Sequence, residues 1–113
     1  MIDDFPWTGS EKQIARKAFN NAYHSECRKI IDTAKKMLAQ SSAPQDLWKV
    51  HDYLTQERRK TDEKYRYRYS VLILVFAKLI HEGRLTENDL DGLHADKLEA
   101  IRKYLRFWSK VND

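Results

Sequence analysis

The sequence contains few of the residues that interrupt helices. Its 113 residues include three glycines and two prolines, and residues 45–82 contain neither. Because glycine and proline are the strongest breakers of regular structure, the secondary-structure elements should be long. The composition therefore predicts an all-α fold.

Cysteine and long apolar runs are equally scarce. The single cysteine, Cys27, cannot form an intrachain disulfide and lacks metal or redox spacing, so we expect a buried, inert thiol. No apolar run approaches the roughly 20 residues of a membrane span, and residues 1–4 do not resemble the start of a signal peptide. These absences predict one small cytoplasmic domain, residues 1–113, with no membrane partner.

A helical hairpin is expected in the first part of the chain. Apolar residues recur every three or four positions along residues 10–40, after a short extended lead at residues 5–7. Residues 41–44 form a short break, and a connection of this length favours an antiparallel hairpin.

Two capping boxes are predicted in this hairpin. Ser10 with Gln13 has the spacing that would open the first helix, and Ser42 with Gln45 could cap the second.

The second helix is expected to run from about Pro44 to Glu82, where Gly83 ends it. Such a helix would be on the order of 60 Å long, so much of it should pack against another chain. A kink near residues 59–62 is an alternative. Residues 69–80 alone are typical of a strand, but the helical period of the flanking charges and the lack of a pairing strand favour a helix.

A small helical head is expected after Gly83. A short helical turn should begin at Thr86 and end at Gly92, and a last helix should cover roughly residues 96–110. These elements should fold onto the apolar end of the second helix. The expected fold is thus a long antiparallel hairpin, or stalk, at about residues 10–65 with a head at about residues 66–110.

Polar residues interrupt the apolar stripe of the second helix at His51, Arg58 and Thr61. An unpaired polar group that leaves water costs a few kcal/mol, so a second copy of the chain is the expected partner. At about 100° per residue, an arc of roughly 120° gathers five candidate residues: Trp48, His51, Asp52, Arg58 and Asp62. In an antiparallel homodimer, Asp52 of one chain could meet Arg58 of the other.

Catalysis and metal binding are not expected. His51 and Asp52 resemble a general base with its orienting carboxylate, but sequence neighbours on a helix point about 100° apart, which disfavours a triad-like hydrogen bond. No nucleophile motif, phosphate loop or metal-ligand spacing accompanies them, and the four histidines are scattered. We expect no enzyme activity, no small-molecule substrate, no cofactor and no metal.

The net charge of +4 originates in residues 58–68, where six basic residues outnumber the two acidic ones, Asp62 and Glu63. In the rest of the chain the numbers of basic and acidic residues are equal. Basic and aromatic residues alternate there, as they do on many nucleic-acid surfaces. A solvated helix face with packed tyrosines is the simpler interpretation. Nucleic acid is therefore not expected as a partner.

Several segments of the sequence resemble one known family. DLWKVHDYL, then RR, DEKYRYRYSVLILVFAKLIHEG and LDGLHADKL are similar to the fluorescence recovery protein family of cyanobacteria, over about residues 10–102. This resemblance implies an all-helical antiparallel homodimer without enzymatic activity. It also implies binding to the photoactivated orange carotenoid protein, chiefly to its C-terminal domain, which speeds the return to the orange form and release from the phycobilisome.

The resemblance also suggests roles for particular residues. It places the family's functional patch on Trp48, His51, Asp52 and Arg58, and a second, partner-binding surface near Leu74, Phe76 and Lys97 of the head. Similar chains from bacteria without the carotenoid protein would have another partner. The choice between dimer and tetramer stays open, as does a role for residues 104–108, which could extend the last helix.

Overall fold

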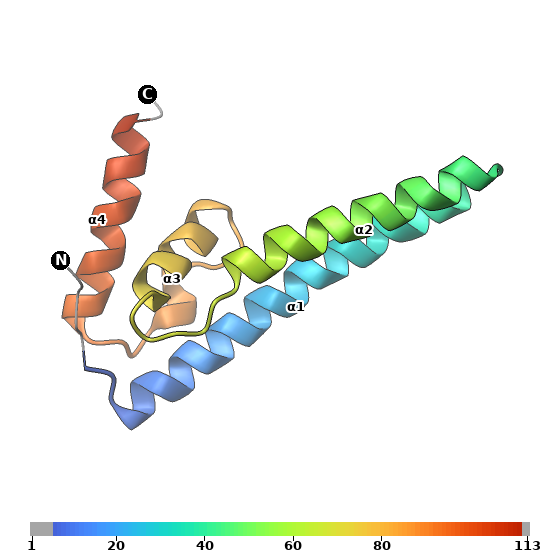
Figure 1. Ribbon diagram of the computed structural model, residues 1–113. Helices are drawn as coiled ribbons and strands as arrows, with labels where there is room; N and C mark the ends of the chain where they lie inside the picture. Colours follow the sequence, from blue (N-terminus) through green and yellow to red (C-terminus); the bar gives the residue numbers. More distant parts are fainter. Residues whose placement is uncertain (1–5, 112–113) are drawn as a thin grey trace. The chain divides into compact units, whose positions relative to one another are not determined.

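The computed structural model describes residues 6–111, and these residues form helices and loops without any strand (Figure 1). The prediction of an all-α fold is therefore confirmed. In chain order the elements are α1 (Gly9–Ala39), α2 (Pro44–Lys64), α3 (Leu72–His81), the short 3-10 helix η1 (Glu87–Leu90) and α4 (Ala95–Val111). Of the expected lead at residues 5–7, Phe5 lies outside the described part.

The chain divides into two compact units. The hairpin unit comprises Tyr23–Tyr65, and the two-segment unit comprises Met1–Ala22 together with Arg66–Asp113. The first part of α1 thus belongs with the elements after residue 66, although the sequence reading assigned it to the stalk.

The hairpin unit is an antiparallel pair of helices, residues 23–39 of α1 and the whole of α2 (Figure 1). The carboxylate of Glu26 accepts hydrogen bonds of 2.7 Å from Lys64 Nζ and of 2.7 Å from the Tyr65 hydroxyl. Glu26 lies near the start of the α1 segment of this unit, and both donors lie at the end of α2, so the two helices run in opposite directions, as predicted.

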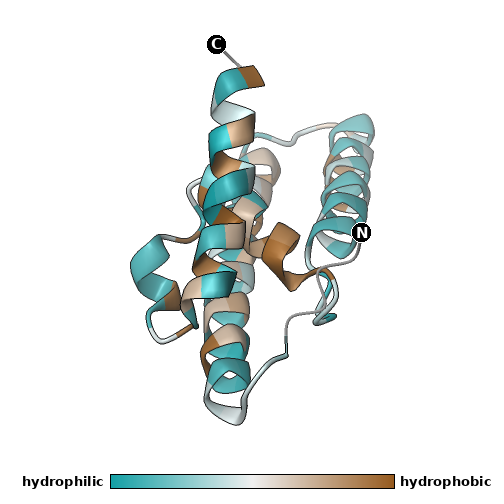
Figure 2. Ribbon diagram, turned by 90° about the vertical axis from the view of Figure 1, so that its left-hand side faces the viewer, coloured by the Kyte–Doolittle hydropathy of each residue, from teal (hydrophilic) through white to brown (hydrophobic). Residues whose placement is uncertain are grey.

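The two-segment unit contains the main apolar core. In the hydropathy colouring of Figure 2, α3 is mostly hydrophobic, whereas hydrophilic residues predominate in the longer helices. Leu72, Phe76 and Leu79 of α3 are fully buried, as is Ile101 of α4, and α3 packs against α4. The expected packing of the last helix onto this apolar segment is confirmed.

The caps of α1 and α2 differ from the predicted ones. At the start of α1, the Thr8 hydroxyl accepts a 3.2 Å hydrogen bond from Glu11 N, while Glu11 Oε1 accepts one of 3.1 Å from Thr8 N. At the start of α2, one carboxylate oxygen of Asp46 accepts the N–H groups of Ser42 and Ala43. A carboxylate suits the positive end of a helix better than the neutral glutamines at the predicted positions.

The predicted length of the second helix, from about Pro44 to Glu82, is wrong. It ends at Lys64, and residues 65–71 leave the helical path before α3 begins. This break lies beyond the alternative kink at residues 59–62 and contains no glycine or proline. Its cause is aromatic packing: the ring of Tyr67 lies edge-on to Phe19 at 4.9 Å and under the Arg16 guanidinium at 3.6 Å.

The later elements agree with the prediction. Thr86 N donates to Asp89 Oδ2 at 2.9 Å, which opens η1 at the expected position. Gly83 and Gly92 have φ of 80° and 103°, a conformation that glycine adopts without strain. The last helix begins at Ala95 and extends to Val111, so residues 104–108 do prolong it.

Candidate interaction site

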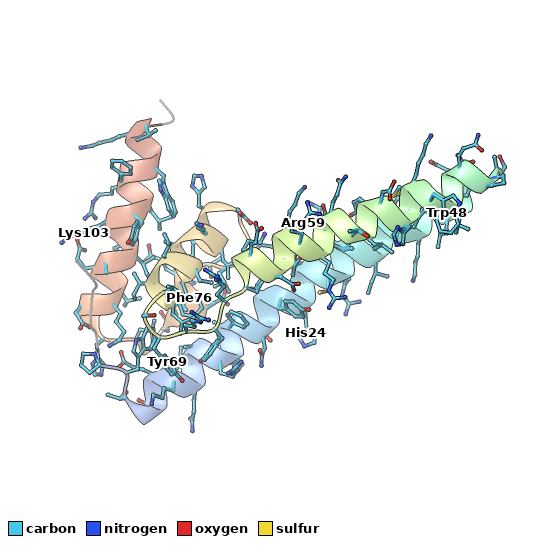
Figure 3. The ribbon with its side chains drawn as sticks, in the orientation of Figure 1. His24, Trp48, Arg59, Tyr69, Phe76 and Lys103 are labelled. Carbon is cyan, nitrogen blue, oxygen red and sulfur yellow. The ribbon has the colours of Figure 1, made fainter. Side chains whose placement is uncertain are left out.

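The five candidate residues of the hairpin unit lie exposed on α2. Figure 3 shows Trp48 near the start of this helix, where its side chain is 60% exposed. Because α2 is helical throughout its length, the expected arc forms one continuous face. Its members are Trp48, His51, Asp52, Arg58 and Asp62.

Charged groups on this face pair within the same helix. Arg58 Nε lies 3.7 Å from Asp62 Oδ2, and His51 Nδ1 lies 3.5 Å from Asp52 Oδ1. The second distance lies within ion-pair range but exceeds the roughly 2.6–3.2 Å of a catalytic hydrogen bond, so it does not make His51 and Asp52 a triad-like pair. All four side chains are well exposed, and exposed pairs contribute little to stability. They remain available to exchange partners.

The one buried polar residue that interrupts the apolar stripe of α2 finds its hydrogen-bond partner within the same chain. Thr61 is buried, and its hydroxyl donates a 2.6 Å hydrogen bond to the Glu57 carbonyl one turn earlier. His51 and Arg58, the other two interruptions, are exposed. In a single chain, therefore, no buried polar group of the stripe demands a partner.

Exposed apolar side chains give a better reason for a partner. Leu47 and Leu54 flank the candidate face on α2, and Ile31 and Leu38 lie on α1; all four are exposed. Single exposed leucines are ordinary, but several on one small unit together with a tryptophan are typical of an interaction surface.

A groove of about 340 Å³ opens between the two helices of the hairpin unit. Cys27 lies in it and is half-buried, not buried as expected. A hydrogen bond with the Cys27 thiol, aided by burial, raises the pKa of the Tyr23 phenol above its usual value. The groove thus brings apolar side chains together with the charged pair of α2. Its lining residues are Tyr23, Cys27, Ile30, Leu54, Glu57, Arg58, Thr61 and Asp62.

Half of the basic run is already paired. Lys60 Nζ lies 3.3 Å from a Glu57 oxygen, Lys64 Nζ lies 2.7 Å from Glu26, and Arg58 pairs with Asp62. The run also extends over both units. Fewer free cations therefore remain for phosphate groups than the sequence suggested.

The candidate residues of the head differ widely in exposure. Leu74 is half-buried, whereas Phe76 and Lys97 are fully buried within the two-segment unit. Phe76 is part of the core of α3, so its side chain does not reach the surface. Of the three, Leu74 alone has surface for direct contact.

The buried charge of Lys97 is paired with Glu11, a residue that the sequence reading did not single out. Lys97 Nζ lies 3.1 Å from Glu11 Oε1 and donates a 2.7 Å hydrogen bond to the Pro6 carbonyl. The other oxygen of Glu11 accepts the His94 N–H at 2.8 Å. A sequence signal existed: Lys97 lies four residues before Ile101, inside the apolar stripe of α4.

Hydrogen bonds control the ionisation of Glu11. Burial alone would raise its pKa, but the backbone N–H groups of His94 and Thr8 and the ammonium of Lys97 outweigh that cost and lower the pKa to about 2. The carboxylate is therefore charged at every physiological pH.

Two further kinds of site were searched for in residues 6–111. No helix there is both long and apolar enough to cross a membrane. No group of three or more histidine, cysteine or acidic side chains is arranged to hold a metal ion in that range.

Comparisons with known proteins give a consistent result. Residues 7–104 match the family described as photoprotection regulator fluorescence recovery protein. The fluorescence recovery protein of Synechocystis sp. is 39% identical over 101 residues, which cover 89% of this chain and 93% of that protein. The solved structure of the Fremyella diplosiphon fluorescence recovery protein is 39% identical, with a TM-score of 0.82 over 89% of this chain and 99% of that one. The Synechocystis structure gives a TM-score of 0.83 at the same identity and coverage.

Proposed function

Because this chain belongs to the fluorescence recovery protein family of photoprotection regulators, we propose that it regulates photoprotection by binding the photoactivated orange carotenoid protein. Binding would involve chiefly the C-terminal domain of that partner. It would accelerate the return from the red to the orange form and detachment from the phycobilisome, restoring antenna fluorescence. This function requires no covalent chemistry, so the protein would act without being an enzyme.

The observation that carries this proposal is the extent of the family match. It covers residues 7–104, which include α2 with its exposed face, α3 and most of α4. The match to this family of regulators therefore extends over nearly the whole chain. In the cell, a regulator of this kind would work in the cytoplasm beside the phycobilisomes.

Differential binding provides the mechanism. A protein that binds the arrangement between the red and orange forms more tightly than it binds the red form lowers the barrier between them. Such a scaffold needs apolar anchors and polar groups that set the orientation. Leu74 in the two-segment unit offers an accessible anchor, with Phe76 and Lys97 beneath the surface.

The exposed face of α2 would form an antiparallel homodimer. Reciprocal pairs between Asp52 and Arg58 place the two-fold axis near residue 55, so Trp48 of one copy falls opposite Asp62 of the other. Asp62 borders the groove of the hairpin unit. The exposed indole of the second copy would therefore cover that groove, including Cys27.

The decisive experiment mixes the protein with photoconverted orange carotenoid protein and follows the red-to-orange recovery in darkness by absorbance. We expect a clear acceleration at stoichiometric amounts. Asp52→Asn and Arg58→Gln, both on α2, should reduce this acceleration. Lys36→Gln, a change of an exposed residue on α1, should not. No acceleration at excess protein would contradict the proposal.

Salt distinguishes the alternative, a dimer of the same fold with another partner such as nucleic acid. Binding to nucleic acid through the basic run should weaken steeply with salt, whereas a partly apolar protein contact should depend on it less. The three internal ion pairs of that run favour the protein partner.

A further inference from the structure

The ammonium of Lys97 is enclosed on all sides within the two-segment unit. The residue is 0% exposed, and so is its partner Glu11. Besides the ion pair, the ammonium binds the Pro6 carbonyl at 2.7 Å and lies 5.1 Å from the ring centre of Trp7. A residue placed in this way cannot touch another protein. Any effect of Lys97 on partner binding must reach the surface through its neighbours.

The contacts of the pair lead to two aromatic rings near the surface, one half-buried and one exposed. The Trp7 ring, half-buried, lies 5.6 Å from the ring of Tyr69, which is 38% exposed. The ammonium of Lys12 lies 5.1 Å over the same Tyr69 ring. No carboxylate among the described residues lies within ion-pair distance of Lys12. These groups form a small surface, the aromatic strip, defined as Trp7, Tyr69 and Lys12.

We infer that the aromatic strip is part of the surface that meets the protein partner, and that Glu11 and Lys97 are the positioning residues that hold it in place. This inference rests on the proposed function. The matching surface of the partner would be apolar and bordered by a carboxylate, because the strip offers two rings and one cation without a carboxylate partner of its own.

The physical reason is the cost of a separated buried charge. Removing Lys97 leaves the Glu11 carboxylate buried without its cation, which is strongly destabilising, whereas removing both charges is often close to neutral. The segment from Pro6 to Thr8 would lose its link to α4 and, with it, the position of Trp7. If Lys97 contacted the partner directly, removing Glu11 as well would not restore binding. If Lys97 only positions Trp7, removing both charges should restore it.

The test uses the dark recovery assay with four variants and one control. Lys97→Met should slow recovery about tenfold, and adding Glu11→Gln should restore it to within about threefold of the unaltered protein. Trp7→Ala and Tyr69→Ala leave the pair intact and should each slow recovery severalfold. Phe107→Ser is the matched control, because Phe107 is an exposed aromatic residue of the same unit outside the matched range of the family.

Each result decides the inference. A folded double variant as slow as Lys97→Met, or normal recovery in both Trp7→Ala and Tyr69→Ala, would overturn it. Should Lys97→Met fail to fold, the two ring variants decide alone. Should the unaltered protein not accelerate recovery, the proposed function fails, and the positioning role is judged by amide exchange. The Thr8 and His94 amides should then exchange faster in Lys97→Met and regain protection in the double variant; no such change would reject the positioning role.

Discussion

At the scale of single residues, Glu11 performs two tasks that usually fall to separate groups. It completes the cap of α1 through the Thr8 N–H, and it neutralises the buried ammonium of Lys97. Hydrogen bonds from Thr8, His94 and Lys97 hold its pKa at about 2 against the cost of burial. A carboxylate with a lowered pKa stabilises the fold above its usual value near 4.5 and loses that contribution as the pH falls towards 2.

Glu11→Gln should therefore lower the free energy of unfolding at pH 7 by about 3 kcal/mol, which is the order of magnitude that this pKa difference implies. The difference from the unaltered protein should shrink as the pH falls from 4.5 to 2. Urea unfolding at several pH values measures it. Asp32→Asn, an exposed change on α1, is the control and should alter little. A difference that stays constant across this pH range would contradict the role of the ionised carboxylate.

At the scale of the elements, the break between α2 and α3 is the feature that local sequence does not explain. Residues 65–71 have no helix breaker, and the chain leaves the helix because Tyr67 gains contacts with Phe19 and Arg16 of α1. Burial and the neighbouring Tyr69 raise the pKa of Tyr67 to about 12, which agrees with a packed phenol.

Tyr67→Ala should reduce the free energy of unfolding by about 2 kcal/mol, since a large, half-buried ring loses its packing contacts. It should also raise the helix content, because alanine favours helix where the packing that opposed it is gone. Tyr67→Phe keeps the ring and should cost less than about 1 kcal/mol. Circular dichroism and urea unfolding measure both effects. Equal losses in the two variants would show that the hydroxyl, not the ring, holds the segment.

At the scale of the whole molecule, the hairpin unit has too little core of its own for its exposed apolar surface. Val50 and Thr61 are the buried residues of α2, while Trp48, Leu47 and Leu54 face solvent. A second copy would bury these side chains and close the groove that contains Cys27.

Sedimentation should accordingly show a dimer at micromolar concentration and a shift towards monomer in Trp48→Glu, which places a charge in the proposed interface. The reaction of Cys27 with a thiol reagent should slow as the protein concentration rises, and should lose this dependence in Trp48→Glu. Phe107→Glu, an equally exposed change on α4, should leave both measurements as they are. A monomer at all these concentrations would refute the dimer.

The sequence by itself determined what depends on neighbours along the chain. Helical period and the placement of glycines were enough for the all-α fold, for η1 at Thr86 and for the last helix, because these features arise from local geometry. The exposed arc of α2 followed from the same period, since a regular helix carries it wherever the helix lies.

Tertiary structure decided what depends on residues far apart in the chain. The end of α2 at Lys64 requires tyrosines to meet α1, and the burial of Lys97 requires Glu11 from the opposite end of the chain. A lysine in an apolar stripe is a faint signal until its counter-charge is located. The reason is physical: burial and ion pairing are properties of the space around a residue, whereas helix formation is largely a property of the residues next to it.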